Sequence, residues 1–322
     1  MPKLGLKAKL LLAALIFVAL IAIGAVFFPV PQPEVHLSPN YGGHSPDPFF
    51  TLGPFYFSNT LIASCITLVV LVSLFALATR RMKLVPGRLQ NMAESVIEWL
   101  LNFMEGIAGP DNTRRFFPVV ATIFLFVITN AWLGLIPVFN FIGWVAPHPE
   151  PVATSFFGDY TGPIVEVALF RGANTDINVP LMLALVSFVC VEYWGITAVG
   201  PRHYISKFVR LQQFSSGLKE LVKGHVKAGI GAIMSGAIDM FVGALEGLSE
   251  FVRIISFTFR LFGNMTAGEV LLMVMLFLIP FCSLFVVFYI LELLLGFVQA
   301  LIFGGLTLVF ATMAVAPHET EH

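Results

Sequence analysis

Charged residues are scarce in this chain. Only 11% of its 322 residues are Asp, Glu, Lys or Arg, whereas 57% are hydrophobic and the mean hydropathy is +0.89. A soluble domain carries about 25% charged residues, so this composition excludes a water-soluble globular protein. The formal net charge of −1 leaves no basic surplus to neutralise phosphates, which argues against nucleic acid as a partner. The composition therefore predicts an all-α polytopic membrane protein.

Residues that hold metals or perform covalent chemistry are also few. The three cysteines (Cys65, Cys190 and Cys282) lie in apolar runs without CxxC spacing, which is typical of buried thiols. The chain has no HExxH or GxSxG motif, and none of its seven histidines falls within a predicted span. We therefore predict no cofactor and no metal site, and the sequence argues against an intramembrane hydrolase or metalloenzyme.

Apolar stretches long enough to cross a bilayer are abundant. A transmembrane helix needs about 20 apolar residues. Six stretches qualify: 10–30, 58–79, 116–139, roughly 177–199, roughly 250–279, and 283–316. The first follows three lysines, so residues 1–31 are either a membrane anchor or a signal sequence, and we favour the anchor. The last would form a helix about 50 Å long, which must tilt, kink or lie partly in the membrane plane.

The basic residues predict the orientation. With the N-terminus in the cytoplasm, 15 of the 18 Lys and Arg residues lie on the inside, and the outside segments carry only Arg171. Arg253 and Arg260 lie within the fifth apolar stretch. Positive charge accumulates on the cytoplasmic side of membrane proteins, so we predict six spans with both termini in the cytoplasm. We also predict an external loop at 32–57 and a C-terminal tail at 317–322.

The region 58–245 contains two further segments between its spans. Residues 88–108, between Pro86 and Pro110, predict an amphipathic helix that lies on the cytoplasmic membrane surface or packs against another subunit. Residues 200–245 are predicted as a long cytoplasmic loop, and whether its apolar part touches the membrane stays open. Residues 246–316 are predicted as a long helical hairpin.

Among the ionisable residues within predicted spans, four are candidates for a function: Glu192, Arg260, Glu269 and Glu292. Placing a charge in a bilayer is costly, about 2.5–3.5 kcal/mol for Arg on insertion scales, so such residues are usually functional. Arg260 is the strongest candidate because arginine cannot escape the cost by losing its proton. For Glu192, near a cytoplasmic helix end, a purely structural role is an equal alternative.

Helical geometry groups the polar residues of the hairpin. At about 100° per residue, one face of its first helix carries five polar side chains: Glu246, Glu250, Arg253, Arg260 and Asn264. Glu269 points to the opposite face. Counting outward from a turn near residues 280–283 places Glu269 level with Glu292. It places Arg260 and Asn264 level with Gln299, as a second polar layer deeper in the hairpin.

The run SFTFRLFGNMTAGE at 256–269 closely resembles the signature of subunit a of F-type ATP synthases. Similar matches occur at 130–137 (NAWLGLIP), at 178–181 (NVPL) and at Gln299-Ala300, so the resemblance covers roughly residues 116–199 and 246–316. It implies a stator with two long, steeply tilted helices packed against the rotating ring of c subunits. It assigns Arg260 as the essential arginine, Asn264, Glu269 and Gln299 as polar neighbours, and Glu246 as a glutamate of a cytoplasmic half-channel.

The resemblance implies a non-catalytic, proton-conducting subunit of a bacterial inner membrane. Protons would pass Glu269 and Glu292 from outside to a c-ring carboxylate and leave near Glu246 and Glu250, with Arg260 as the barrier. The partners implied are the c ring, subunit b and other synthase subunits, lipid and protons.

This chain departs from some family members by having Glu at both 269 and 292, and two facing carboxylates can share one proton. Sodium in place of protons stays open. The alternative is a stand-alone ion-coupled carrier, which the absence of repeat symmetry disfavours.

Overall fold

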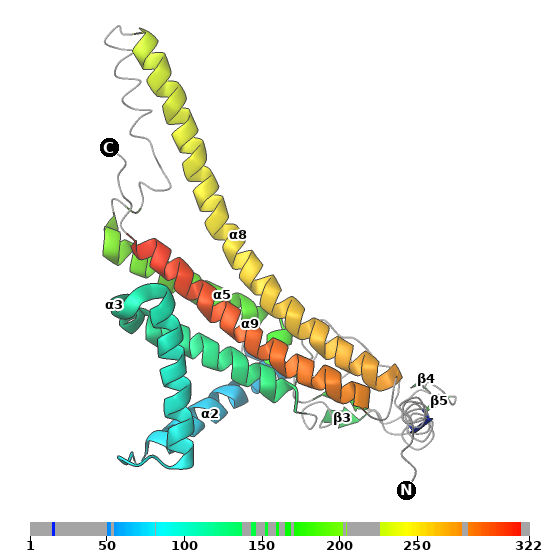
Figure 1. Ribbon diagram of the computed structural model, residues 1–322. Coiled ribbons are helices and arrows are strands. Elements are labelled where there is room, and N and C mark those ends of the chain that lie inside the picture. Colours follow the sequence, from blue (N-terminus) through cyan, green and yellow to red (C-terminus); the bar gives the residue numbers. More distant parts are fainter. Residues whose placement is uncertain are drawn as a thin grey trace, which may run out of the picture. The chain divides into compact units, whose positions relative to one another are not determined.

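The computed structural model describes residues 15–16, 50–52, 55–80, 82–136, 143–145, 152–153, 159–160, 165–168, 171–201, 204, 226–278 and 283–316. Five helices dominate these residues: α2 (Asn59–Thr79), α3 (Arg88–Gly134), α5 (Asn178–Val199), α8 (Val226–Leu278) and α9 (Ser283–Val315) (Figure 1). Each is long and apolar enough to cross a membrane, which confirms the predicted polytopic helical membrane fold. The predicted span 10–30 lies outside the described residues, apart from Leu15 and Ile16.

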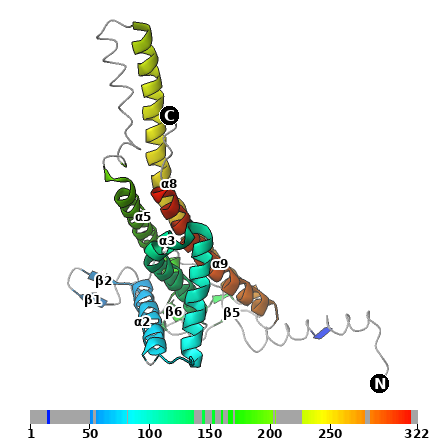
Figure 2. The same ribbon diagram turned by 60° about the vertical axis from the view of Figure 1, so that its left-hand side comes forward.

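Short strands occur in segments that we expected to be external loops. They form three antiparallel pairs: β1 (Phe50–Leu52) with β2 (Phe55–Phe57), β3 (Gly143–Val145) with β6 (Val165–Ala168), and β4 (Val152–Ala153) with β5 (Asp159–Tyr160). Figure 1 labels β3, β4 and β5, and Figure 2 labels β1, β2, β5 and β6. Strands of two to four residues are too short to show a period of two, so the sequence did not reveal them.

Helix α3 contains the predicted break between the amphipathic segment and the following span. At Gly109, φ is 76° and ψ is 164°, a conformation that favours glycine because a side chain would be strained there. The helix resumes at Pro110, which is suited to a first turn because it lacks an N–H. Helical structure thus extends to Gly134, whereas we predicted a span from 116 to 139.

Helix α2 exposes its large apolar side chains and buries its small and polar ones, the reverse of the pattern in water-soluble proteins. Its N-terminus is capped by Ser58, whose hydroxyl oxygen accepts a hydrogen bond from the Leu61 N–H at 3.2 Å. Large apolar side chains such as Leu68 and Val69 are exposed, whereas the buried residues are small or polar. This arrangement is typical of helices in lipid, where small residues permit close packing and apolar ones face the acyl chains.

Helix α8 begins at Val226 and has 53 residues, so it is about 80 Å long. The predicted loop 200–245 is therefore helical over its last twenty residues, and the predicted start of the hairpin at 246 was too late. Glycine-rich, almost uncharged sequence gave no amphipathic signal there. Helix α9 has 33 residues, which confirms the single long helix predicted for 283–316.

The chain divides into two compact units, and both long helices pass through each. The first unit comprises Met1–Met82, Leu125–Ile177 and Leu261–Leu301. The second comprises Lys83–Phe124, Asn178–Arg260 and Ile302–His322.

Aromatic contacts form the core of the second unit, with ring centroids 4.6 Å apart for Phe116 and Trp194 and 5.0 Å apart for Phe257 and Phe303. A buried hydrogen bond of 2.8 Å joins the hydroxyls of Ser187 on α5 and Thr307 on α9. These contacts fix α3, α5, α8 and α9 within this unit.

The charge distribution predicts which ends of the helices face the cytoplasm. Single cysteines introduced at Lys83 and at Asp159, in a chain whose native cysteines are replaced by serine, are expected to react with a membrane-impermeant thiol reagent from opposite sides. Lys83 precedes α3 in a basic segment, whereas Asp159 lies in β5 within a segment that has one basic residue. Labelling of both from the same side would contradict the six-span topology.

Candidate functional site

In the first unit, α8 and α9 lie side by side and share a polar layer (Figure 1). The side-chain amide of Asn264 donates a hydrogen bond of 3.1 Å to the Oε1 atom of Gln299. Gln299 is only 1% exposed, whereas Asn264 is exposed, so the amide pair joins an interior side chain of α9 to the surface of α8. The contact confirms the hairpin register that we counted from the sequence.

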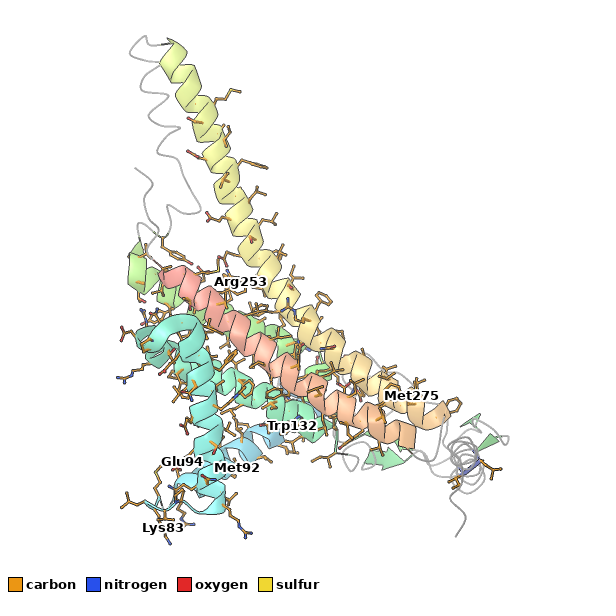
Figure 3. The ribbon with its side chains drawn as sticks, in the orientation of Figure 1. Lys83, Met92, Glu94, Trp132, Arg253 and Met275 are labelled. Carbon is orange, nitrogen blue, oxygen red and sulfur yellow. The ribbon has the colours of Figure 1, made fainter. Side chains whose placement is uncertain are left out.

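Glu292 lies level with the residue that precedes Glu269. It is 4% exposed, and its carboxyl group rests directly against Gly268, where a Cβ atom would overlap the carboxylate oxygens. At the next residue of α9, the Leu293 carbonyl oxygen accepts a hydrogen bond of 3.2 Å from the indole N–H of Trp132 (Figure 3). Glu269 and Glu292 therefore lie at one depth, as predicted, and the absence of a side chain at residue 268 creates the space for Glu292.

The resemblance to subunit a of F-type ATP synthases implies proton conduction, and on that basis Gly268→Ala is expected to lower proton flux about two- to tenfold without lowering helix stability. The added methyl group forces the Glu292 carboxylate out of its position, and an off-rotamer side chain costs about 0.5–1.5 kcal/mol. Alanine is also a better helix former than glycine. Proton uptake by membrane vesicles measures the effect, and Gly263→Ala is the matched control because a Cβ there meets nothing within 4 Å. Equal flux in both variants would contradict a role for the Glu292 position.

Glu269 has a partner that the sequence analysis missed. The Nε–H group of Arg171 donates to its Oε2 atom at 3.2 Å, and the two side chains are 9% and 17% exposed. Glu269 is thus paired with a cation, in addition to lying level with the second carboxylate that we predicted. The sequence did single out Arg171, because it is the only basic residue in the predicted outside segments. It could not identify Glu269 as the partner, because helical periodicity does not relate residues that are 98 positions apart.

Buried polar groups continue from Arg171 into the short helix η1 (Ala173–Thr175) and its neighbours. The Oδ1 atom of Asn130 on α3 accepts the Ala173 N–H at 3.1 Å, and the Thr60 hydroxyl donates to Asp176 at 2.8 Å. Asn130, Asn174 and Asp176 are all at most 4% exposed. Among the described residues, the Asn130 amide nitrogen and both polar atoms of the Asn174 side chain have no hydrogen-bond partner. This part of the first unit is therefore polar and retains hydrogen-bonding capacity.

The second unit holds the acidic part of the predicted site. Arg253 on α8 forms an ion pair with Glu250 one turn earlier, and its guanidinium carbon lies 4.2 Å from the centroid of the Phe310 ring on α9 (Figure 3). Glu246 precedes Glu250 by another turn of the same helix. Two predicted carboxylates and one cation therefore lie along one stretch of α8.

Arg260, the last residue of α8 that belongs to the second unit, is exposed. It donates a hydrogen bond of 3.3 Å to the Ser256 hydroxyl, and its guanidinium carbon lies 5.8 Å from the Phe257 ring. Within the part of the chain that the structure describes, no carboxylate forms an ion pair with it. Asn264 follows one turn later on α8. The predicted site thus contains a permanent charge that is exposed on a helix long enough to cross the membrane.

Comparisons with known proteins place these residues in a family. The family model described as the ATP synthase A chain matches residues 61–312. The chain belongs to this family. It is 29% identical over 274 residues to ATP synthase subunit a of Helicobacter pylori strain Shi470, covering 84% of this chain and 97% of the relative. The same protein of Gloeobacter violaceus is 28% identical over 273 residues, covering 84% and 89%.

Membership of the ATP synthase A chain family defines the setting of the site. The chain is a multi-pass membrane protein and a component of the membrane sector of F-type ATP synthase, and its partners are other synthase subunits. The family match includes α8 and α9 over all of the residues that we selected from the sequence.

Proposed function

We propose that this subunit conducts protons to and from a rotating ring of c subunits through two offset half-channels, with Arg260 as the barrier between them. The observation that carries the proposal is the exposure of Arg260 on a membrane-spanning helix. A guanidinium facing lipid would be costly, so the exposed surface needs a partner that presents negative charge. A membrane-embedded carboxylate on the ring supplies that charge.

The outer half-channel runs through the polar groups of the first unit. The buried amides of Asn130 and Asn174 offer hydrogen bonds to water, which needs two to four polar partners in a protein interior. Glu269, held by Arg171, and Glu292, held against Gly268, then receive protons and pass them to the ring. A protonated ring carboxylate is neutral and can rotate through lipid.

The inner half-channel uses the carboxylates of the second unit. Glu246 and Glu250 lie in the N-terminal half of α8, on the side that we predict to face the cytoplasm, where they accept protons that the ring releases. Arg260 attracts the ionised ring carboxylate and repels a proton that would cross directly, and its charge is permanent because the guanidinium does not deprotonate in proteins. Each proton that crosses contributes about 2.3 kcal/mol per 100 mV of membrane potential. The subunit itself performs no covalent chemistry.

Purification distinguishes this function from that of a stand-alone carrier. An affinity tag on this chain, in mildly solubilised bacterial inner membranes, is expected to recover a c ring, subunit b and the soluble ATPase subunits. A carrier that binds substrate between Arg260 and Glu269 would be recovered alone. Recovery of the tagged chain without a c ring would contradict the proposal.

A further inference from the structure

A tyrosine that follows α5 closes over a glutamate of that helix. Helix α5 ends at Val199, and it is followed by Gly200, where φ is +90°, and by Pro201. The Tyr204 N–H donates to the Gly200 carbonyl oxygen at 2.9 Å, and the Tyr204 hydroxyl donates to Oε2 of Glu192 at 2.6 Å. The chain thus turns back on itself so that Tyr204 reaches a carboxylate two helical turns from the end of α5.

Gly195 provides the space for this contact. A Cβ atom at residue 195 would lie 2.7 Å from Cε2 of the Tyr204 ring and 3.3 Å from the Ala314 Cβ on α9. The ring therefore occupies the position that a side chain would take, and Tyr204 is 7% exposed. This tight packing restricts the Tyr204 ring to a position from which its hydroxyl contacts Glu192.

The pair lies within electrostatic reach of the acidic stretch of α8. The pKa of the Tyr204 hydroxyl is raised above its usual range, first by burial and then by its hydrogen bond to Glu192 and the charge of that carboxylate. Arg253 lowers this pKa and Glu246 raises it further, so both charges act on the same hydroxyl. All of these residues belong to the second unit.

Glu192 also retains a free position for a proton. Its Oε1 atom is buried and has no hydrogen-bond partner among the described residues, whereas Oε2 is occupied by Tyr204. If the carboxylate only anchored Tyr204, the bond at Oε2 would be sufficient. Leaving the other carboxylate oxygen buried without a hydrogen-bond partner costs free energy, so its unpaired state needs another explanation. A proton acceptor needs such a position.

We propose that Glu192 is a third proton-accepting carboxylate of the inner half-channel, beside Glu246 and Glu250, and that Tyr204 is the positioning residue that holds it. This inference rests on the proposed function. Oε1 takes a proton that leaves the ring side of the channel and releases it toward the cytoplasmic end of α5, while Tyr204 keeps the carboxylate oriented. No bond other than that to the proton forms or breaks.

The test is passive proton flux through the whole membrane sector, in vesicles stripped of the soluble ATPase subunits and driven by a potassium diffusion potential. Glu192→Gln preserves shape and an acceptor oxygen for Tyr204 but cannot take up a proton. We expect it to lower flux about tenfold, short of complete loss because Glu246 and Glu250 remain. Tyr204→Phe keeps the ring beside Gly195 and should lower flux about two- to threefold. Tyr193→Phe, whose hydroxyl belongs to an exposed residue on the same helix, is the matched control and should conduct normally.

Two further measurements distinguish a loss of assembly, a wrong role for Glu192 and a wrong proposed function from one another. Recovery of the c ring with each variant shows that the complex is assembled, and Glu192→Asp, which restores a carboxylate, should recover part of the flux. Normal flux in Glu192→Gln together with strongly reduced flux in Glu269→Gln would overturn the role of Glu192 alone. Normal flux in both variants would overturn the proposed function as well. Equal losses in the Gln and Asp variants would also contradict the relay.

Discussion

Replacing Arg260 with alanine is expected to abolish ATP-driven proton pumping and to open a passive proton leak. Pumping fails because the ionised carboxylate of the ring loses the charge that attracts it. The leak appears because the two half-channels lose the fixed positive charge that keeps protons from crossing between them. The two effects are separable, since one needs ATP and the other does not.

Arg260→Lys tests whether the permanence of the charge matters. A lysine away from water can lose its proton, and it lacks the planar fork of a guanidinium. We therefore expect it to fail in coupling but to leak less than alanine. Ser256→Ala is the matched control, because it removes only the 3.3 Å hydrogen bond to Arg260 and leaves the charge in place. The measurement is acidification of inside-out vesicles with and without ATP, and normal acidification by Arg260→Ala would refute the mechanism.

The second large effect is expected from the carboxylates of the first unit. Glu269→Gln or Glu292→Gln alone should slow ATP-driven pumping, and the double variant should reduce it by about 100-fold or more, as expected when positioned proton-transfer groups are lost. Histidine at 292 should support pumping better than leucine, because imidazole can also carry a proton. Glu105→Gln on the exposed face of α3 is the control. Normal pumping by the double variant would place the outer path elsewhere.

The hairpin and its polar layers could be predicted from the sequence because helices have a uniform rise. Counting residues from the turn was enough to pair Asn264 with Gln299 and to bring Glu292 level with Glu269, and the structure has both relations. The break at Gly109-Pro110 was equally predictable, because the two residues carry a local conformational signal.

Contacts that depend on loops could not be predicted. The Arg171–Glu269 pair joins a segment before α5 to the C-terminal part of α8, and no periodicity connects the two. The helical start of α8 at Val226 was hidden because small apolar residues give no amphipathic pattern. Tyr204 was missed for a related reason, since its place over Glu192 depends on the turn at Gly200 and the space at Gly195.

The most direct measurement of the central claim is passive proton flux into liposomes that contain purified c ring and subunit b, with and without this chain. Proton flux under a potassium diffusion potential is expected only when the chain is present, and it should be lost when the chain carries both Glu269→Gln and Glu292→Gln. Flux of equal size without the chain, or unchanged flux with the double variant, would show that protons reach the ring by a route that this subunit does not provide.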